Sequence, residues 1–193
     1  DKQYRFPVFL AVSFALFNQV SGINAIIYYA PRVFEMAGLG AQSSLLSTVG
    51  VGLVNFSFTL IAINVMDRVG RRKLMFIGSV GLIAALVLVA RAFFSEQPDG
   101  LAVTIYLMVY IAFFAFSQGA VIWVFISEIF PNEVRAKGQT LGSLTHWLMA
   151  AVITFVFPLL SEQLGGGITF LVFAGFMVLQ LFFVWKFMPE TKG

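Results

Sequence analysis

Three carboxamide side chains, Asn18, Gln19 and Asn24, lie close together in a stretch that is otherwise apolar enough to sit in a lipid bilayer. A carboxamide both donates and accepts hydrogen bonds, and hydrocarbon satisfies neither group. In a membrane segment, such side chains are therefore expected to face a bundle interior or a water-filled cavity. Gly22 lowers the cost of bending or unwinding the helix between Gln19 and Asn24. The stretch predicts a binding site for a polar ligand at mid-membrane.

The alternative is that these amides only hold helices together. Hydrogen bonds between membrane helices are common and contribute about 0.6 kcal/mol on average. That interpretation is favoured for an isolated amide such as Asn64. The clustering of three amides beside a glycine favours ligand binding instead.

The composition places these amides in a membrane protein. Hydrophobic residues make up 60% of the 193 residues and charged residues only 11%, and the mean hydropathy is +0.93. A helix needs roughly 20 apolar residues to cross a bilayer. The sequence therefore predicts an all-α membrane protein with six transmembrane helices, at about 7–30, 45–66, 74–94, 101–130, 138–160 and 168–188.

The basic residues predict the orientation. If the first residues are cytoplasmic, six crossings return the C-terminus to the cytoplasm, and only Arg32 and Arg91 of the 12 Lys and Arg residues fall outside. This asymmetry follows the positive-inside rule, so both termini are expected in the cytoplasm of a plasma or bacterial inner membrane. It also accounts for the basic pI without a nucleic-acid partner. No secretory signal peptide is apparent, and the start at Asp1 suggests a processed or excised piece of a longer chain.

The six predicted helices form two triplets with a common pattern. In each, a glycine-interrupted polar helix is followed by a helix with some polar groups and then by an apolar helix. Three crossings separate the copies, so their orientations are inverted, and inverted repeats of this kind are typical of transporters. The third helix has little polar character except Ser79, and we expect it to face lipid.

Enzymatic functions lack the necessary residues. The sequence has no cysteine and one histidine, so disulfides, thiolate metal sites and cysteine nucleophiles are excluded. An intramembrane hydrolase would need an acid to orient His146, and none is apparent in the membrane interior. We expect no enzymatic activity, cofactor or metal.

Several motifs, in order along the whole chain, resemble those of the sugar porter family of the major facilitator superfamily. They are NQVSGIN at 18–24 followed by Tyr28 and Tyr29, DRVGRR at 67–72, Trp123 with SEIFP at 127–131, Arg135, and PETKG at 189–193. The family includes glucose facilitators and proton-coupled sugar symporters. The resemblance implies that residues 1–193 are the C-terminal six-helix half of such a transporter.

The resemblance also implies which residues bind a monosaccharide, a hexose or a pentose. The positions that match the family's sugar-contacting residues are Gln19, Asn24, Asn55 and Trp123. Asn18 stands where a second glutamine is usual, and His146, beside Trp147, stands where relatives carry glutamine or asparagine. The amides would bond the sugar hydroxyls, and a tryptophan would cover the apolar C–H face of the ring.

The resemblance further implies that a charged cluster forms an inner gate. It consists of Asp67, Arg71, Arg72, Glu128 and Arg135, whose salt bridges would close the cytoplasmic side in one state and separate in the other. The positive-inside rule alone explains basic residues in these loops, but it does not explain the two acids. The two acids therefore favour the interpretation of the cluster as a gate.

The resemblance predicts sugar transport by alternating access, in which one six-helix half rocks against the other. One copy of the chain should not transport alone, so the partner is either a missing N-terminal half or a second copy of the chain. Proton coupling stays open, because the coupling acid of the family's symporters belongs to the other half. The alternative is a sugar-binding membrane sensor or scaffold that does not transport.

Overall fold

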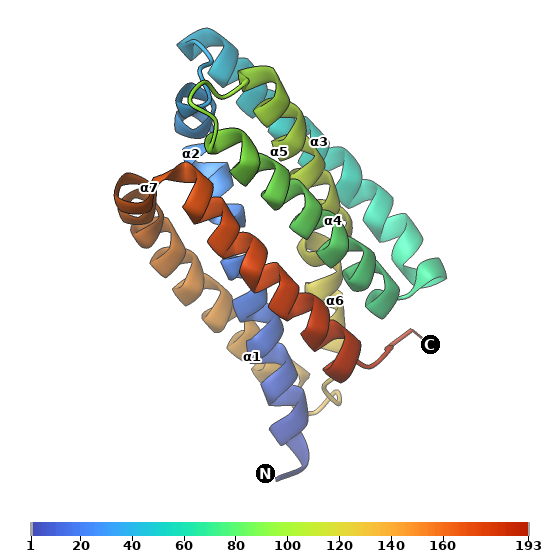
Figure 1. Ribbon diagram of the computed structural model, residues 1–193. Helices are drawn as coiled ribbons and strands as arrows, with labels where there is room; N and C mark the ends of the chain where they lie inside the picture. The colour runs from blue at the N-terminus through green and yellow to red at the C-terminus, as the bar shows by residue number, and fades with distance from the viewer. Residues whose placement is uncertain (1, 193) are drawn as a thin grey trace.

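The computed structural model describes residues 2–192, and its regular elements are all helical. The elements are η1 (Lys2–Tyr4), α1 (Arg5–Val20), α2 (Ile23–Met36), α3 (Ala41–Val69), α4 (Arg71–Phe93), α5 (Gly100–Phe114), the π-helix η2 (Ala115–Gly119), α6 (Ala120–Glu128) and α7 (Arg135–Phe187). The long helices lie side by side in one elongated bundle (Figure 1). The apolar composition is therefore organised as a helical membrane bundle.

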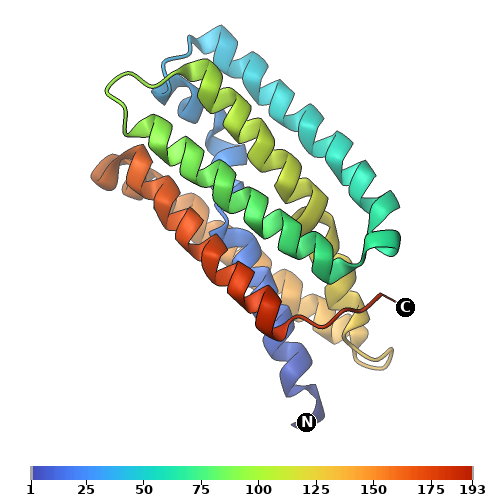
Figure 2. The same ribbon diagram turned by 45° about the vertical axis from the view of Figure 1, so that its right-hand side comes forward.

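Within residues 2–192, five helical units, rather than six, are long and apolar enough to cross a membrane: Lys2–Met36, Ala41–Val69, Arg71–Phe93, Gly100–Glu128 and Arg135–Phe187. The fifth unit has 53 residues and would be about 80 Å long if straight, far more than the roughly 30 Å of a bilayer core. It is not straight, because Gly165 adopts φ 78° and ψ 161°. At this glycine α7 turns back on itself, and its second segment runs alongside the bundle (Figures 1 and 2).

The predicted break in the first helix is confirmed at Gly22. This glycine has φ 88°, and it separates α1 from α2. A Cβ atom at Gly22 would lie 2.6 Å from the ring of Phe173, so both the backbone conformation and the packing require glycine here. The predicted end of this helix at residue 30 is wrong, since α2 continues through Pro31 to Met36. The backbone bends at Tyr29 (φ −107°, ψ 15°), which lets the helix continue past the proline.

The third predicted helix does not face lipid as expected. More than half of the most apolar window of α4 is buried, whereas only 17% of that of α3 is. The cause is close packing at Gly81, where a Cβ atom would lie 2.3 Å from the ring of Phe113 in α5. Small residues of this kind let membrane helices approach closely. The outward apolar surface belongs mainly to α3, with Leu46 and Phe56 more than 60% exposed.

Two buried apolar clusters fill the bundle. Phe14, Phe125 and Phe183 belong to one cluster, with ring centroids 5.2 Å apart in the Phe14–Phe125 and Phe14–Phe183 pairs. The other cluster begins in the first unit at Val20 and includes Phe173. Asn18 and Gln19 lie along the chain between Phe14 and Val20. The predicted amide cluster is therefore located where the two apolar clusters meet.

Candidate functional sites

Gln19 is the centre of the amide cluster. Its Nε2 donates to Asn18 Oδ1 at 2.9 Å, and its Oε1 accepts from Asn24 Nδ2 at 2.7 Å. Gln19 and Asn18 are buried, and Asn24 is partly buried. On a straight helix, residues five apart point about 140° away from each other. The break at Gly22 is what lets Asn24 contact Gln19.

Two other helices contribute to the same cluster. Gln19 Nε2 lies 3.1 Å from Nδ1 of His146 in α7. The His146 ring packs edge-on against Trp123 of α6 and against Trp147, with centroids 4.9 Å and 5.1 Å away. Six of the seven residues predicted for the site are thus in one contiguous group.

The group reaches the surface at Trp147, which is 62% exposed, whereas Gln19 and Asn18 are buried. Trp147 lines a groove of about 440 Å³ together with Tyr28, Tyr29 and Phe155, and the amides of the group do not line it. Amides that both donate and accept suit the hydroxyls of a neutral polyol, and aromatic faces suit its C–H surface. The arrangement can therefore bind a small polar solute without charge pairing.

The structure does not bring Asn55 into this group. Asn55 lies on α3, where its backbone carbonyl accepts from Thr59. Its side chain makes no hydrogen bond to any residue in 2–192. Because α3 is the most exposed helical unit, its side chains have few partners within the bundle.

A buried polar chain, which the sequence did not predict, adjoins the amide cluster. Gln118 Nε2 donates to Gln180 Oε1 at 2.6 Å, and Gln180 Nε2 donates to Ser79 Oγ at 2.7 Å. Asn18 Nδ2 donates to the backbone carbonyl of Gln118 at 3.3 Å. Each of these residues was visible as a polar residue in an apolar segment. Nothing in their spacing indicated that three separate helices would bring them together.

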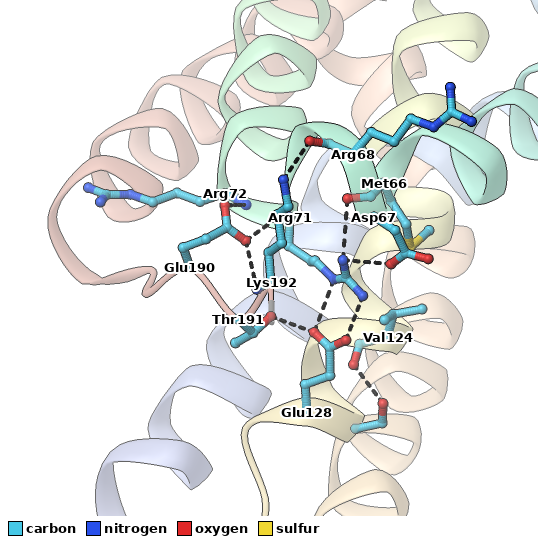
Figure 3. A network of polar contacts seen from close by, with 11 residues as sticks. Met66, Asp67, Arg68, Arg71, Arg72, Val124, Glu128, Glu190, Thr191 and Lys192 are labelled. Atoms are coloured by element: carbon cyan, nitrogen blue, oxygen red, sulfur yellow. Dashed lines mark hydrogen bonds and ion pairs between the residues drawn. The ribbon is translucent and has the colours of Figure 1, made fainter.

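Arg71 is the centre of the charged cluster (Figure 3). Its guanidinium binds Glu128 through two contacts, Nη2 to Oε1 at 2.6 Å and Nε to Oε2 at 3.1 Å. Nη1 also pairs with Asp67 at 2.8 Å. The Arg71 side chain is 8% exposed, that of Glu128 27% and that of Asp67 76%. The Arg71–Glu128 pair is thus the protected part of the cluster, and it links the start of α4 to the end of α6.

The C-terminal tail completes the cluster, although the sequence analysis gave it no role. The Glu190 carboxylate accepts from the backbone N–H groups of Arg71 at 2.9 Å and Arg72 at 3.2 Å, where the first turn of α4 has unpaired donors and a positive dipole end. Thr191 donates to Glu128. The signal in the sequence was the PETKG motif, because its acid and hydroxyl are groups that suit the start of a helix, such as α4.

Two predicted members of the cluster lie apart from its ion pairs. The Arg72 guanidinium donates to the backbone carbonyl of Trp185 at 2.7 Å rather than to an acid. Arg135 is exposed at the first residue of α7 and forms no salt bridge with a residue in 2–192. The ion-paired cluster therefore consists of Asp67, Arg71 and Glu128.

Membrane-length helices around a cluster of amides and aromatic rings define a polytopic membrane protein. The sequence profile of the sugar (and other) transporter family matches residues 1–193. The chain belongs to this family, as the sequence motifs predicted.

Known members are similar over part of their length. The chain is 39% identical over 192 residues to a glucose facilitated diffusion protein of Zymomonas mobilis, and the match covers 96% of the chain but only 40% of that protein. It is 35% identical over 192 residues to a D-xylose–proton symporter of Escherichia coli, and the match covers 96% of the chain but only 39% of that protein. A solved structure of a proton:xylose symporter bound to 6-bromo-6-deoxy-D-glucose is similar, with a TM-score of 0.87, 35% identity, and coverage of 96% of this chain and 40% of that one. The chain thus spans about two-fifths of these relatives, which are transporters and not enzymes.

Proposed function

We propose that this chain takes part in moving a monosaccharide across a membrane by alternating access and supplies most of the sugar-binding groups. The observation that carries the proposal is the convergence of Gln19, His146 and Trp123 from three helices on one partly open site. Each hydrogen bond to a sugar replaces one to water and contributes roughly 0.5–1.5 kcal/mol. The resulting modest affinity suits a carrier, which must release what it binds. The names of the relatives, glucose and xylose carriers, support a hexose or pentose.

The chain is proposed to be the C-terminal half of a twelve-helix transporter. Support comes from the order of the motifs and from the fold in α7 at Gly165. If the two segments of α7 cross separately, six crossings arise in two inverted triplets, as in one half of a major facilitator. Coverage of about two-fifths of the relatives agrees with a missing half. A second copy of the chain is the alternative partner.

The charged cluster is proposed to act in an inner gate. Arg71 and Glu128 join α4 to α6 across one end of the bundle. The turn between α3 and α4 lies at the same end as both chain ends (Figure 2), which suits cytoplasmic termini beside a cytoplasmic gate. Contacts of the charged cluster that together contribute a few kcal/mol are enough to bias an equilibrium between a closed and an open state.

Sugar uptake into liposomes tests the proposal. The chain alone, shown to be monomeric, is expected to give no flux. Adding the amino-terminal six helices of the Escherichia coli xylose symporter is expected to restore it. Flux from the monomer would contradict the half-transporter, and rescue by the symporter's carboxyl-terminal half would contradict the assignment as the C-terminal half. Saturable sugar binding without flux in any combination would favour the sensor or scaffold.

A further inference from the structure

His146, the single histidine of the chain, defines the orientation of the Gln19 amide. Gln19 Nε2 donates to Asn18 Oδ1 at 2.9 Å and lies 3.1 Å from His146 Nδ1 and 3.5 Å from His146 Nε2, and Gln19 Oε1 accepts from Asn24. Because an amide nitrogen only donates, the ring nitrogen that it binds must hold a lone pair, and the shorter distance assigns this role to Nδ1. The ring proton of neutral His146 is therefore on Nε2.

A proton on Nδ1 would place a donor against a donor. Turning the Gln19 amide over would bring Oε1 to the ring, but Nε2 would then face the Asn24 Nδ2 donor at the present 2.7 Å contact. Oε1 would also face the acceptor Asn18 Oδ1 at the present 2.9 Å contact, so Asn24 and Asn18 would both have to turn over. A single proton therefore rearranges the hydrogen-bonding groups that a sugar would meet.

Among residues 2–192, no ion pair offsets such a proton. The helices packed against α7 are α1, α2, α4 and α6, and their charged residues lie near their ends: Arg5, Arg32, Glu35, Arg71, Arg72, Lys73, Arg91 and Glu128. Those of α7 itself are Arg135, Lys137, Glu162 and Lys186.

Two acids and one phenol on these helices have partners elsewhere. Glu128 pairs with Arg71, and Glu162 pairs with Arg32 at 3.4 Å. Tyr29 donates its hydroxyl to the Thr154 carbonyl at 3.1 Å. Within residues 2–192, His146 has no ion pair, so a charged ring would have no acid to stabilise it.

We propose that neutral His146 is a positioning residue that holds the Gln19 amide for sugar binding, and that a proton on its ring weakens that binding. The inference rests on the proposed sugar site. Affinity is constant at alkaline pH and falls as the ring takes up a proton. The loss of one net hydrogen bond corresponds to a decrease of about 2- to 12-fold.

Equilibrium binding of glucose and xylose to the chain in lipid nanodiscs, at about pH 8 and about pH 5.5, tests the proposal. His146→Gln keeps a hydrogen-bonding side chain that does not titrate, so its affinity is expected to be the same at both pH values. Thr145→Ala is the matched control, because the Thr145 hydroxyl donates to the Leu141 carbonyl of its own helix, and it is expected to keep the wild-type pH dependence. A pH-independent wild type, or a His146→Gln variant with the wild-type pH dependence, would overturn the proposal.

A second readout does not require sugar. With ¹⁵N-labelled histidine, the single imidazole is expected to show an unprotonated Nδ1 and a protonated Nε2 at alkaline pH, and this preference should be lost in Gln19→Leu. A protonated Nδ1 in the wild type would contradict the positioning role. If the tautomer is as expected but no sugar binds at any pH, the proposed function fails while the His146–Gln19 contact stands.

Discussion

Replacing Glu128 with glutamine should destabilise the chain far more than replacing Asp67 with asparagine. Both acids bind the same arginine, Arg71, but in different surroundings. Glu128 is 27% exposed and receives two guanidinium contacts, whereas Asp67 is 76% exposed and receives one. Since Arg71 is only 8% exposed, water does not readily replace a lost partner.

The expected magnitudes follow from this difference in exposure. Removing one partner of a buried ion pair costs about 3–5 kcal/mol, and the partial exposure of Glu128 lowers this to about 2–3 kcal/mol. An exposed pair such as Arg71–Asp67 contributes at most about 1 kcal/mol. Glu128→Gln should therefore change the unfolding equilibrium constant by about 30- to 160-fold, and Asp67→Asn by no more than about 5-fold.

Reversible unfolding in mixed detergent–SDS micelles, followed by circular dichroism, measures both changes. A double-mutant cycle with Arg71→Met isolates the Arg71–Glu128 coupling. Equal effects of Glu128→Gln and Asp67→Asn, or no coupling in the cycle, would refute the conclusion that the protected pair dominates the cluster.

Three further substitutions test the fold by the same unfolding assay. Gly22→Ala combines an unfavourable positive φ with a clash against Phe173 and should cost about 2 kcal/mol or more. A Gly22→Ala variant with wild-type stability would show that this position does not require glycine. Gln180→Leu leaves the buried Gln118 amide without its 2.6 Å partner and should cost about 1–3 kcal/mol, while an unchanged unfolding midpoint would show that the polar chain contributes nothing. Asp99→Ala removes the side chain that accepts from two N–H groups at the start of α5 and should cost about 1 kcal/mol, which Asp99→Asn should largely avoid.

The local part of the candidate site could be predicted because its determinants are adjacent in sequence. Gln19, Gly22 and Asn24 lie within six positions, and a break between two amides indicates convergence without knowledge of other helices. The contact between Gln19 and His146 joins residues 127 positions apart. No periodicity within either segment encodes that distance, so only the family resemblance directed attention to His146.

Helix exposure was the least predictable part of the fold. α4 has little polar character in its membrane-spanning part apart from Ser79, so its sequence predicted that it would face lipid. In a membrane, lipid tails are as apolar as leucine, so apolar character does not decide which helix is inside. The close approach at Gly81 decides it for α4, and glycine spacing is the signal that could have indicated it.

Sugar binding by the amide cluster is tested most directly by titrating glucose and xylose against the tryptophan fluorescence of the purified chain, in the wild type, Gln19→Ala and Asn64→Ala. Asn64 is the control, because it is exposed and its amide bonds only to the Leu60 carbonyl of its own helix. We predict saturable quenching that weakens about tenfold or more in Gln19→Ala, because a direct contact and the support of Asn24 are both lost, and that is unchanged in Asn64→Ala. Sugar binding that is equally strong in Gln19→Ala, or no binding of either sugar to the wild type, would contradict the account.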